Sequence, residues 1–419
     1  MPLTRRSVLA MTTAGLVLPG RVCAAPASER RFLFVFVRGG WDTSRVFTPL
    51  FDNPYASQED GAVLASAGNI PFVDHPDRPS VRTFFERWHE DLAVLNGFEV
   101  RSVTHERCRK ILMTGSADGQ DDWPTLLAAH GSTELVLPHI VVSGPAYSNR
   151  HSAKIVRVGS AGQLPELLDG TALERSTQAV APPSGDLGAL QDAFLREQLE
   201  TLGSAAGRGR ESALIQGYVG ALDQLAATAE YTDALDLVPS YGGCSRDLTN
   251  DAKAVLDTFE LGLSRCGMIQ HNGWCDSSWD THDANDAQTL HFEELFGYLS
   301  AILEDLETRT GPDGDALARS TTVVVISEMG RHPQLNSYGG KDHWTFTSAM
   351  LLGAGIRGGQ VVGSLDDNGT GVPIDLTSGE PSGSGTVPLA SHLGATLLAL
   401  GDVDPAEHLD ESPIQALLS

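Results

Sequence analysis

The segment RFLFVFVRGGWDTS, residues 31–44, decides the fold. Its first seven residues form a continuous apolar run that is rich in strand-forming side chains and is closed by two glycines. Such a run is typical of a strand buried on both faces in a parallel sheet. Similar runs predict further strands at TTVVVIS (321–327), SAMLLGAG (348–355), HIVVSGP (139–145) and, more weakly, CGMIQHN (266–272).

Helical periodicity fills the sequence between these runs. It predicts helices over about residues 185–202, 211–229, 251–264, 287–308 and 389–400. Strands that alternate with helices predict an α/β fold with a mostly parallel central sheet. Residues 161–264 carry almost only helix and loop patterns, so we expect a helical insertion or cap there, within a domain of residues 25–419. The Gly-, Ser- and Asp-rich residues 366–385 predict a surface loop.

Residues 1–24 resemble an export signal. They have a basic start, a short apolar run and small residues at the end, and TRRSVL (4–9) resembles the twin-arginine signal. The run is too short and too rich in Gly and Thr to form a stable membrane span. We expect cleavage after Ala24, passage through the twin-arginine export machinery and a periplasmic or secreted protein. The alternative is an ordinary apolar N-terminus.

The charge of the chain excludes some partners. The formal net charge is −25, and residues 1–24 hold three arginines and no acid, so the mature chain carries −28. Such a surface repels nucleic acid and anionic membranes. It does not exclude an anionic substrate, because a local cationic pocket outweighs distant charges that salt screens.

Four cysteines remain after export. They are Cys108, Cys244, Cys266 and Cys275. An oxidising compartment permits disulfides, and the last three lie close in sequence, so one pair among them is expected. The sequence does not choose which.

Polar side chains gather where the predicted strands end. Asp42 follows the first strand, Asp280 and His282 follow the strand near 266–272, Glu328 follows the strand at 321–327, and His343 precedes the next strand. In open α/β sheets the carboxyl ends of the strands carry function. Two histidines with several carboxylates suit a divalent metal, with zinc favoured and manganese or calcium as alternatives. DTHD (280–283) could instead simply cap the following helix.

The ordered set of motifs resembles the alkaline phosphatase and sulfatase superfamily. WDTHDANDAQTLHFEELFGYLSAILEDL (279–306) is similar to the segment that supplies an Asp and a His ligand ahead of a helix. SEMGR (327–331) resembles its Ser-Asp-His-Gly motif, and the segment from Asp342 to Asp366 resembles its last ligand His, strand and Gly-rich turn. The resemblance is greatest to the exported family called domain of unknown function 1501. It implies a three-layer α/β/α fold.

Several positions depart from that pattern. Arg38 stands where the first strand normally ends in a ligand Asp, and Met329 stands in place of a ligand His. Ser278 occupies the position of an Asp that usually precedes the ligand His. The resemblance therefore implies one retained site at Asp280, His282 and His343, and a second, at Asp42 and Glu328, that has lost its imidazole.

HERCRKILMTG (105–115) resembles the sulfatase turn in which Cys or Ser is the nucleophile. His105 takes the nucleophile's place, Arg109 follows four residues later, and Thr104 adds a hydroxyl. His105 could be a nucleophile, a metal ligand, a general acid, or only a hydrogen-bond partner of a carboxylate. We expect it at a helix start, where the helix dipole would lower its pKa. Arg109 would hold an anionic oxygen, or else form an ion pair with Asp42 or Glu328.

These observations predict an exported metal-dependent hydrolase of a phosphate or sulfate ester. Its partner would be a small anionic ester or a sulfated or phosphorylated polymer. The alternative is a catalytically degenerate binding or assembly protein on the same scaffold. In either case the predicted site residues should meet in one cleft. A shared ion requires ring nitrogens of His282 and His343 closer than about 8 Å.

Overall fold

Strand β1 (Arg31–Val37) lies inside an eight-stranded sheet. In the computed structural model, residues 26–159, 185–206, 209–228, 231, 234, 235, 237 and 240–419 are described; the predicted export signal at residues 1–24 lies outside them. The strands of the sheet, in spatial order, are β14 (Gln360–Val362), β4 (Leu92–Glu99), β13 (Phe346–Gly353), β10 (Thr321–Ser327), β1, β9 (Cys266–His271), β5 (His139–Val141) and β6 (Ile155–Arg157). All of their pairings are parallel except the two made by β13. The predicted mostly parallel sheet is therefore confirmed.

Alternate residues of β1 point into two hydrophobic cores. Phe32, Phe34 and Phe36 belong to one core and Leu33, Val35 and Val37 to the other, and all six are fully buried. Full burial of each such side chain contributes about 1.5–3 kcal/mol, which explains why the six residues after Arg31 are all apolar. A strand buried on both faces requires a layer of helices on each side.

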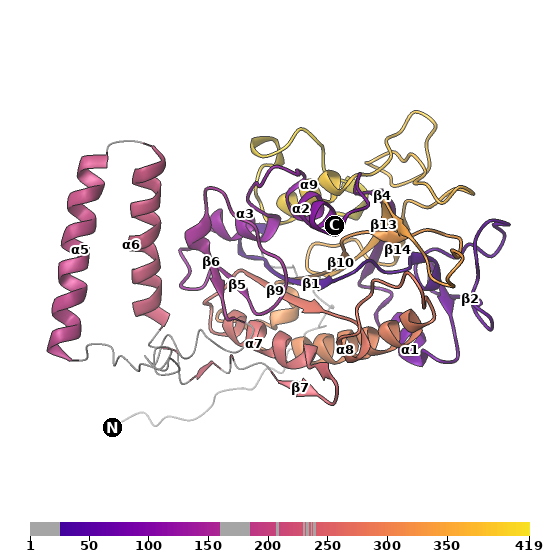
Figure 1. Cartoon of the computed structure of the whole chain (residues 1–419), viewed down its shortest axis with the longest axis horizontal. Coiled ribbons are helices and arrows are strands. Elements are labelled where there is room, and N and C mark those ends of the chain that lie inside the picture. The colour runs from indigo at the N-terminus through magenta and orange to yellow at the C-terminus, as the bar shows by residue number, and fades with distance from the viewer. Residues whose placement is uncertain are drawn as a thin grey trace, which may run out of the picture.

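Helices supply both layers, as Figure 1 shows. One face carries α2 (His105–Thr114), α3 (Trp123–Ala129) and α9 (Ala390–Leu400). The other carries α1 (Pro79–Trp88), α7 (Leu248–Glu260) and α8 (Ala287–Thr308). The fold is thus a three-layer α/β/α arrangement. Three two-stranded pairs complete it: β2 (Val63–Ala67) with β3 (Ile70–Asp74), β7 (Tyr241–Gly242) with β8 (Ser245–Arg246), and β11 (Gly330–Arg331) with β12 (His343–Trp344).

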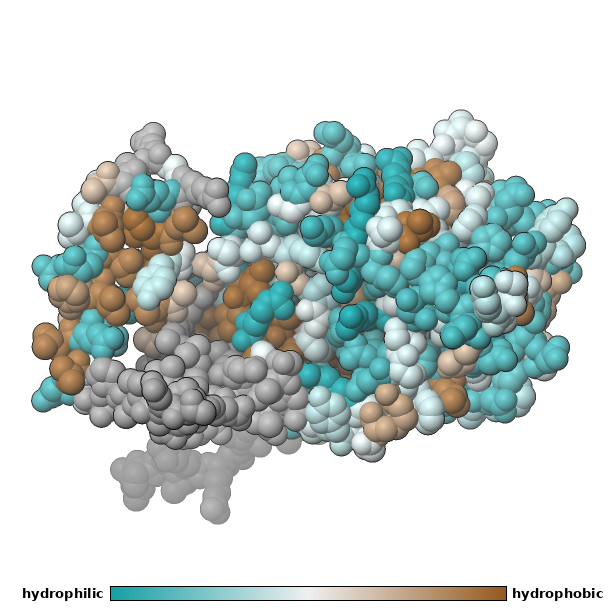
Figure 2. Space-filling model, in the orientation of Figure 1, coloured by the Kyte–Doolittle hydropathy of each residue, from teal (hydrophilic) through white to brown (hydrophobic). Residues whose placement is uncertain are grey.

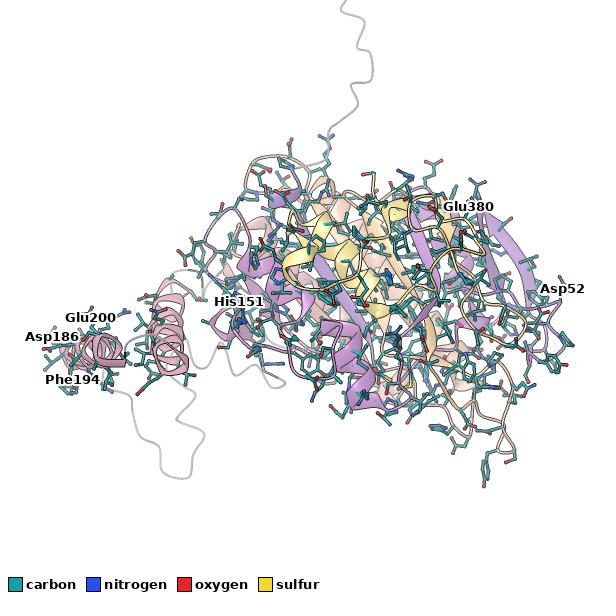
Figure 3. All side chains as sticks on the ribbon, turned by 90° about the horizontal axis from the view of Figure 1, so that it is seen from above. Asp52, His151, Asp186, Phe194, Glu200 and Glu380 are labelled. Atoms are coloured by element: carbon teal, nitrogen blue, oxygen red, sulfur yellow. A yellow bond between two sulfur atoms is a disulfide. The ribbon has the colours of Figure 1, made fainter. Side chains whose placement is uncertain are left out.

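Helices α5 (Asp186–Ala206) and α6 (Arg210–Thr228) form a hairpin beside this body (Figure 1). Both lie in the predicted insertion at 161–264, part of which falls outside the described residues. Helix α7, the last element of that range, packs against β9 and α8 in the body. The hairpin exposes apolar side chains, including Phe194 (Figure 3), and these form much of the brown surface at the left of Figure 2.

The predicted helices are present, α8 with the predicted bounds and the others with shifted ends. Helix α7 starts at Leu248, three residues earlier than predicted, because the Asp247 side chain accepts hydrogen bonds from the first-turn backbone. Helix α1 was not predicted, although Val81, Phe84, Phe85 and Trp88 are buried at helical spacing. None of the described helices is long and apolar enough to cross a membrane.

One disulfide joins Cys244 to Cys275. It ties the β7–β8 turn to the short helix η6 (Trp274–Asp276), which follows β9. The predicted bond among the last three cysteines is confirmed, and Cys108 and Cys266 are buried thiols.

Candidate metal centre

The carboxyl ends of the parallel strands meet at one edge of the sheet, and the candidate residues follow them. His105 begins α2, which comes after β4, Asp280 and His282 follow β9, and Glu328 follows β10. His343 lies just before β13. Because β13 runs antiparallel, its amino end lies at the same edge. Five predicted residues from four segments are thus brought together.

Asp280 lies at the centre of this cluster. One carboxylate oxygen, Oδ1, is 3.0 Å from His343 Nε2 and 3.3 Å from His282 Nε2. The other, Oδ2, is 3.2 Å from His105 Nε2. One nitrogen or oxygen from each of His105, Asp280 and His343 lies within 4.8 Å of the others. Three imidazoles and one carboxylate therefore face a common point.

Each ring has an outer partner for its Nδ1 atom. His105 Nδ1 lies 2.8 Å from Glu328 Oε1, and His282 Nδ1 lies 3.3 Å from Asp342 Oδ1. His343 Nδ1 donates to the Val103 carbonyl at 2.7 Å. Such acceptors fix the hydrogen on Nδ1 of a neutral ring and turn the lone pair of Nε2 inward. This is the arrangement in which proteins hold metal-ligating histidines.

The two inner nitrogens of His282 and His343 are 2.9 Å apart. In neutral rings whose hydrogens lie on Nδ1, two lone pairs would face each other at this distance. That contact is favourable only when a proton or a cation lies between the rings. The separation is far below the roughly 8 Å limit for a shared ion. The donor set of imidazole nitrogen and carboxylate oxygen fits zinc.

Glycines allow the loops to approach so closely. A Cβ on Gly340 would lie 1.9 Å from the carbonyl carbon of His282, and one on Gly39 would lie 2.8 Å from the backbone nitrogen of Asp280. Gly39 also has φ +122°, which side-chain-bearing residues rarely adopt. The glycines after β1 and before His343 are therefore part of how the centre is built.

Arg331 holds Asp280 in place, although it was not among the predicted site residues. Its Nη2 donates to Asp280 Oδ1 at 2.6 Å, and the guanidinium also bonds backbone carbonyls of Gly40 and Lys341. Burial alone would raise the pKa of Asp280, but hydrogen bonds from His105, His343 and Arg331 outweigh it and keep the pKa well below its usual range. The sequence signal was an arginine three residues after Glu328.

The expected lowering of the His105 pKa is wrong for the metal-free protein. His105 does start α2, as predicted, but its hydrogen bonds to Asp280 and Glu328 raise its pKa to about 9. Two adjacent carboxylates outweigh the partial charge of one helix end. Glu328 is buried, and in the part of the chain that the structure describes its second oxygen, Oε2, has no hydrogen-bond partner. A proton or cation is therefore favoured between these groups.

Asp42 does not join the cluster. It is fully buried, and its carboxylate pairs with Lys341 Nζ at 2.8 Å and accepts from Ser44 and Asn285. Burial would raise its pKa, but Lys341 and Arg45 lower the pKa to about 2. The second site expected at Asp42 and Glu328 stays a prediction, and Lys341 would have to leave the Asp42 carboxylate for an ion to bind there.

Arg109 and Thr104 make other contacts than those predicted for them. Arg109 is one turn inside α2, and its guanidinium pairs with Glu106 rather than with Asp42 or Glu328. Thr104 precedes α2, and its exposed hydroxyl lies 3.4 Å from that of Ser102. Neither side chain has a described contact with the histidines.

Distant similarity to solved structures covers most of the chain. A sulfatase from Pseudoalteromonas sp. is 10% identical over 93% of this chain and 72% of its own, with a TM-score of 0.38. A phosphonate monoester hydrolase of Agrobacterium radiobacter is 11% identical over 93% and 77%, with a TM-score of 0.35. A protein solved with its substrate D-glucosamine-2-N,6-O-disulfate is 10% identical over 93% and 80%, with a TM-score of 0.35. Similarity of this degree does not carry an activity from one protein to another.

Comparison with curated protein sequences finds no match. A family match, in contrast, spans residues 29–377, from the start of β1 to beyond β14, and includes every residue of the histidine cluster. The chain therefore belongs to the family described as "Protein of unknown function (DUF1501)".

Proposed function

We propose that this protein is an exported hydrolase that cleaves a phosphate or sulfate ester with the help of a divalent metal ion, zinc in the first place. The observation that carries the proposal is the convergence of three imidazole Nε2 atoms on the Asp280 carboxylate, with each Nδ1 held from outside. The motif order, similar to that of alkaline phosphatases and sulfatases, supports the choice of ester.

Asp280, His282 and His343 would hold the ion. The outer partners of the two Nδ1 atoms and the Arg331 guanidinium behind Asp280 keep these donors in place. A bound ion would supply a Lewis acid for an ester oxygen. Calcium fits less well than zinc or manganese, because it prefers oxygen ligands.

His105 would act beside the ion. Glu328 holds its Nδ1 hydrogen, so Nε2 faces the cluster and either carries a proton toward a leaving oxygen or gives its lone pair to the ion. The first-turn backbone N–H groups of α2 add partial positive charge at the same place. Arg38, exposed at the end of β1 and without a described ion pair, offers a mobile cation for an anionic substrate.

The alternative of a binding or assembly protein rests on two observations. Met329, in the position of a ligand histidine, is fully buried in a hydrophobic core. Arg109, in the position of an anion-binding arginine, is paired with Glu106. Both changes remove groups that the resemblance would assign to chemistry.

Metal analysis of protein purified without chelators and without a histidine tag tests the proposal. We expect bound metal that falls in His282→Ala and His343→Ala, and no change in His89→Ala, whose exposed ring bonds only its own helix. His105→Ala should abolish hydrolysis while keeping the metal if His105 moves a proton, and should lower the metal content if it is a ligand. If the fully metal-loaded protein cleaves none of a broad panel of phosphate, sulfate and phosphonate esters, the hydrolase proposal is wrong and the binding-protein alternative is favoured.

Export is proposed from the N-terminal sequence. Replacing both Arg5 and Arg6 with Lys should retain the protein in the cytoplasm with its signal uncleaved, as checked by fractionation and by the N-terminal sequence of the product. Unchanged export of this variant would contradict the twin-arginine route.

A further inference from the structure

A second group of histidines lies outside the candidate centre. His130 follows α3, and His151 precedes the short helix η3 (Ser152–Lys154). His408 follows the short helix η8 (Pro405–Glu407), which comes after α9 in the chain. The rings of His130 and His408 are 5.1 Å apart between centroids, and those of His130 and His151 are 5.8 Å apart. Figure 3 shows His151 at the side of the α/β body nearest the α5–α6 hairpin, and η3 contacts α6.

In two of these rings, those of His130 and His151, the described hydrogen bond is made by Nδ1 and not by Nε2. His130 Nδ1 donates to the Leu126 carbonyl at 2.9 Å, and His151 Nδ1 lies 3.0 Å from Asp121 Oδ2. Asp121 is held by the backbone N–H groups of residues 149–151 as well. A carbonyl or carboxylate on Nδ1 is the usual outer partner of a metal-ligating histidine.

The third ring has a donor atom with nothing to bind. His408 Nε2 is buried and has no hydrogen-bond partner among the described residues, although leaving a buried polar nitrogen without a partner is unfavourable. The Glu407 carboxylate stands next to it. One ligand atom from each of His130, Glu407 and His408 lies within 4.8 Å of the others. Zinc requires ligand atoms at roughly 2.0–2.2 Å from the ion, so binding would draw these three side chains closer together.

Ring packing alone does not explain this group. Stacking would account for the contacts between rings, but it leaves His408 Nε2 unsatisfied. A single cation would satisfy the lone pairs and the carboxylate together.

We infer that His130, Glu407 and His408 form a second metal site, for a zinc-like transition-metal cation, with the ring of His151 beside that of His130. Borderline imidazole and carboxylate donors favour zinc, nickel or copper over calcium or magnesium. The site would tie the segment after α9 to the end of α3, residues 278 positions apart in the chain (130 to 408). It is independent of the proposed ester hydrolysis.

Zinc stoichiometry tests this inference. The tag-free protein carrying His282→Ala and His343→Ala, which lacks the central ligands, is dialysed against zinc chloride and analysed for zinc by mass spectrometry. We expect one equivalent to remain, and to be lost when His130→Ala and His408→Ala are added. His89→Ala, added instead, should change nothing.

Thermal unfolding with and without zinc chloride gives a second readout. Zinc should raise the midpoint of the central-site double variant, because an ion that binds only the folded state stabilises it, and should not raise that of the quadruple variant. His130→Gln serves as a milder substitution if the double alanine change impairs folding. A double variant that binds no zinc, or a quadruple variant that keeps its equivalent, would overturn the inference. Because the central ligands are absent throughout, failure here says nothing against the proposed hydrolase.

Discussion

Replacing Lys341 with Met should destabilise the protein because it leaves the buried Asp42 carboxylate without its positively charged partner. Lys341 and Asp42 are both almost fully buried, and their charged atoms are 2.8 Å apart. Asp42 has a pKa of about 2 against an ordinary 3.8, a difference that corresponds to roughly 2 kcal/mol of stability at neutral pH. Removing one partner of a buried pair typically costs ~3–5 kcal/mol. We expect a loss of ~3 kcal/mol, since Ser44 and Asn285 still bind Asp42.

Urea unfolding at pH 7 and pH 4 measures this loss. In the wild type the depressed pKa of Asp42 gives stability that is present above pH 3.8 and is lost as the pH falls through about 2. Without Lys341, burial raises the pKa of Asp42, so this carboxyl takes up a proton at pH 4. The difference between variant and wild type should therefore be smaller at pH 4 than at pH 7.

Two matched variants complete the experiment. Lys253→Met removes a half-exposed helix pair with Asp257 and should cost less than ~0.5 kcal/mol. Asp42→Asn combined with Lys341→Met should recover part of the loss and leave bound metal unchanged. A loss for Lys341→Met as small as that of Lys253→Met, or one that does not vary with pH, would refute the reasoning. Loss of metal in the Asp42 variant would restore Asp42 as a ligand.

Three further perturbations test the fold and the site. Cys244→Ser opens a disulfide between residues 31 apart and should lower the free energy of unfolding by ~3–4 kcal/mol in non-reducing urea titrations, with no such difference in reductant. Gly394→Ala would place a Cβ 2.2 Å from the Trp123 ring and should lower the free energy of unfolding by ~1–3 kcal/mol or more. Gly217→Ala lies in open space on α6 and should instead strengthen the hydrogen-exchange protection of α6 by ~0.5–1 kcal/mol. In chelator-treated protein the His105 ring should titrate by NMR with a pKa of about 9, so its stabilising contribution is full below pH 6.5 and is lost as the pH rises through about 9. A midpoint near or below 6.5 would show that the two carboxylates do not hold the ring.

Much of the fold was predictable because strands buried on both faces leave a simple signal. The runs at residues 31–37 and 321–327 have the same bounds in the structure as in the prediction. The apolar residues of helix α1 also recur at helical spacing, so this helix could have been predicted. The antiparallel direction of β13 was not predictable, because a buried strand reads the same in either direction.

The candidate site was partly predictable for a related reason. Residues at strand ends share one edge, so His105, Asp280, His282, Glu328 and His343 could be expected to meet. The pairing of Arg109 with Glu106 was available from their three-residue spacing on one helix. The burial of Asp42 against Lys341 was not, because the two are 299 residues apart and nothing in either local sequence specifies the contact.

Lys341 and His343 show how one short segment serves two purposes. The segment enters the carboxyl edge of the sheet ahead of β13, and Gly340 lets it lie against the backbone of His282. Lys341 then points to Asp42 and neutralises it inside the protein, while His343, two residues later, points to Asp280. Where the resemblance implies a second metal-ligand carboxylate at Asp42, this chain places a lysine ammonium. The positive charge that the resemblance would place beside Asp42 as a second ion is thereby supplied by the polypeptide itself, as the ammonium group of Lys341.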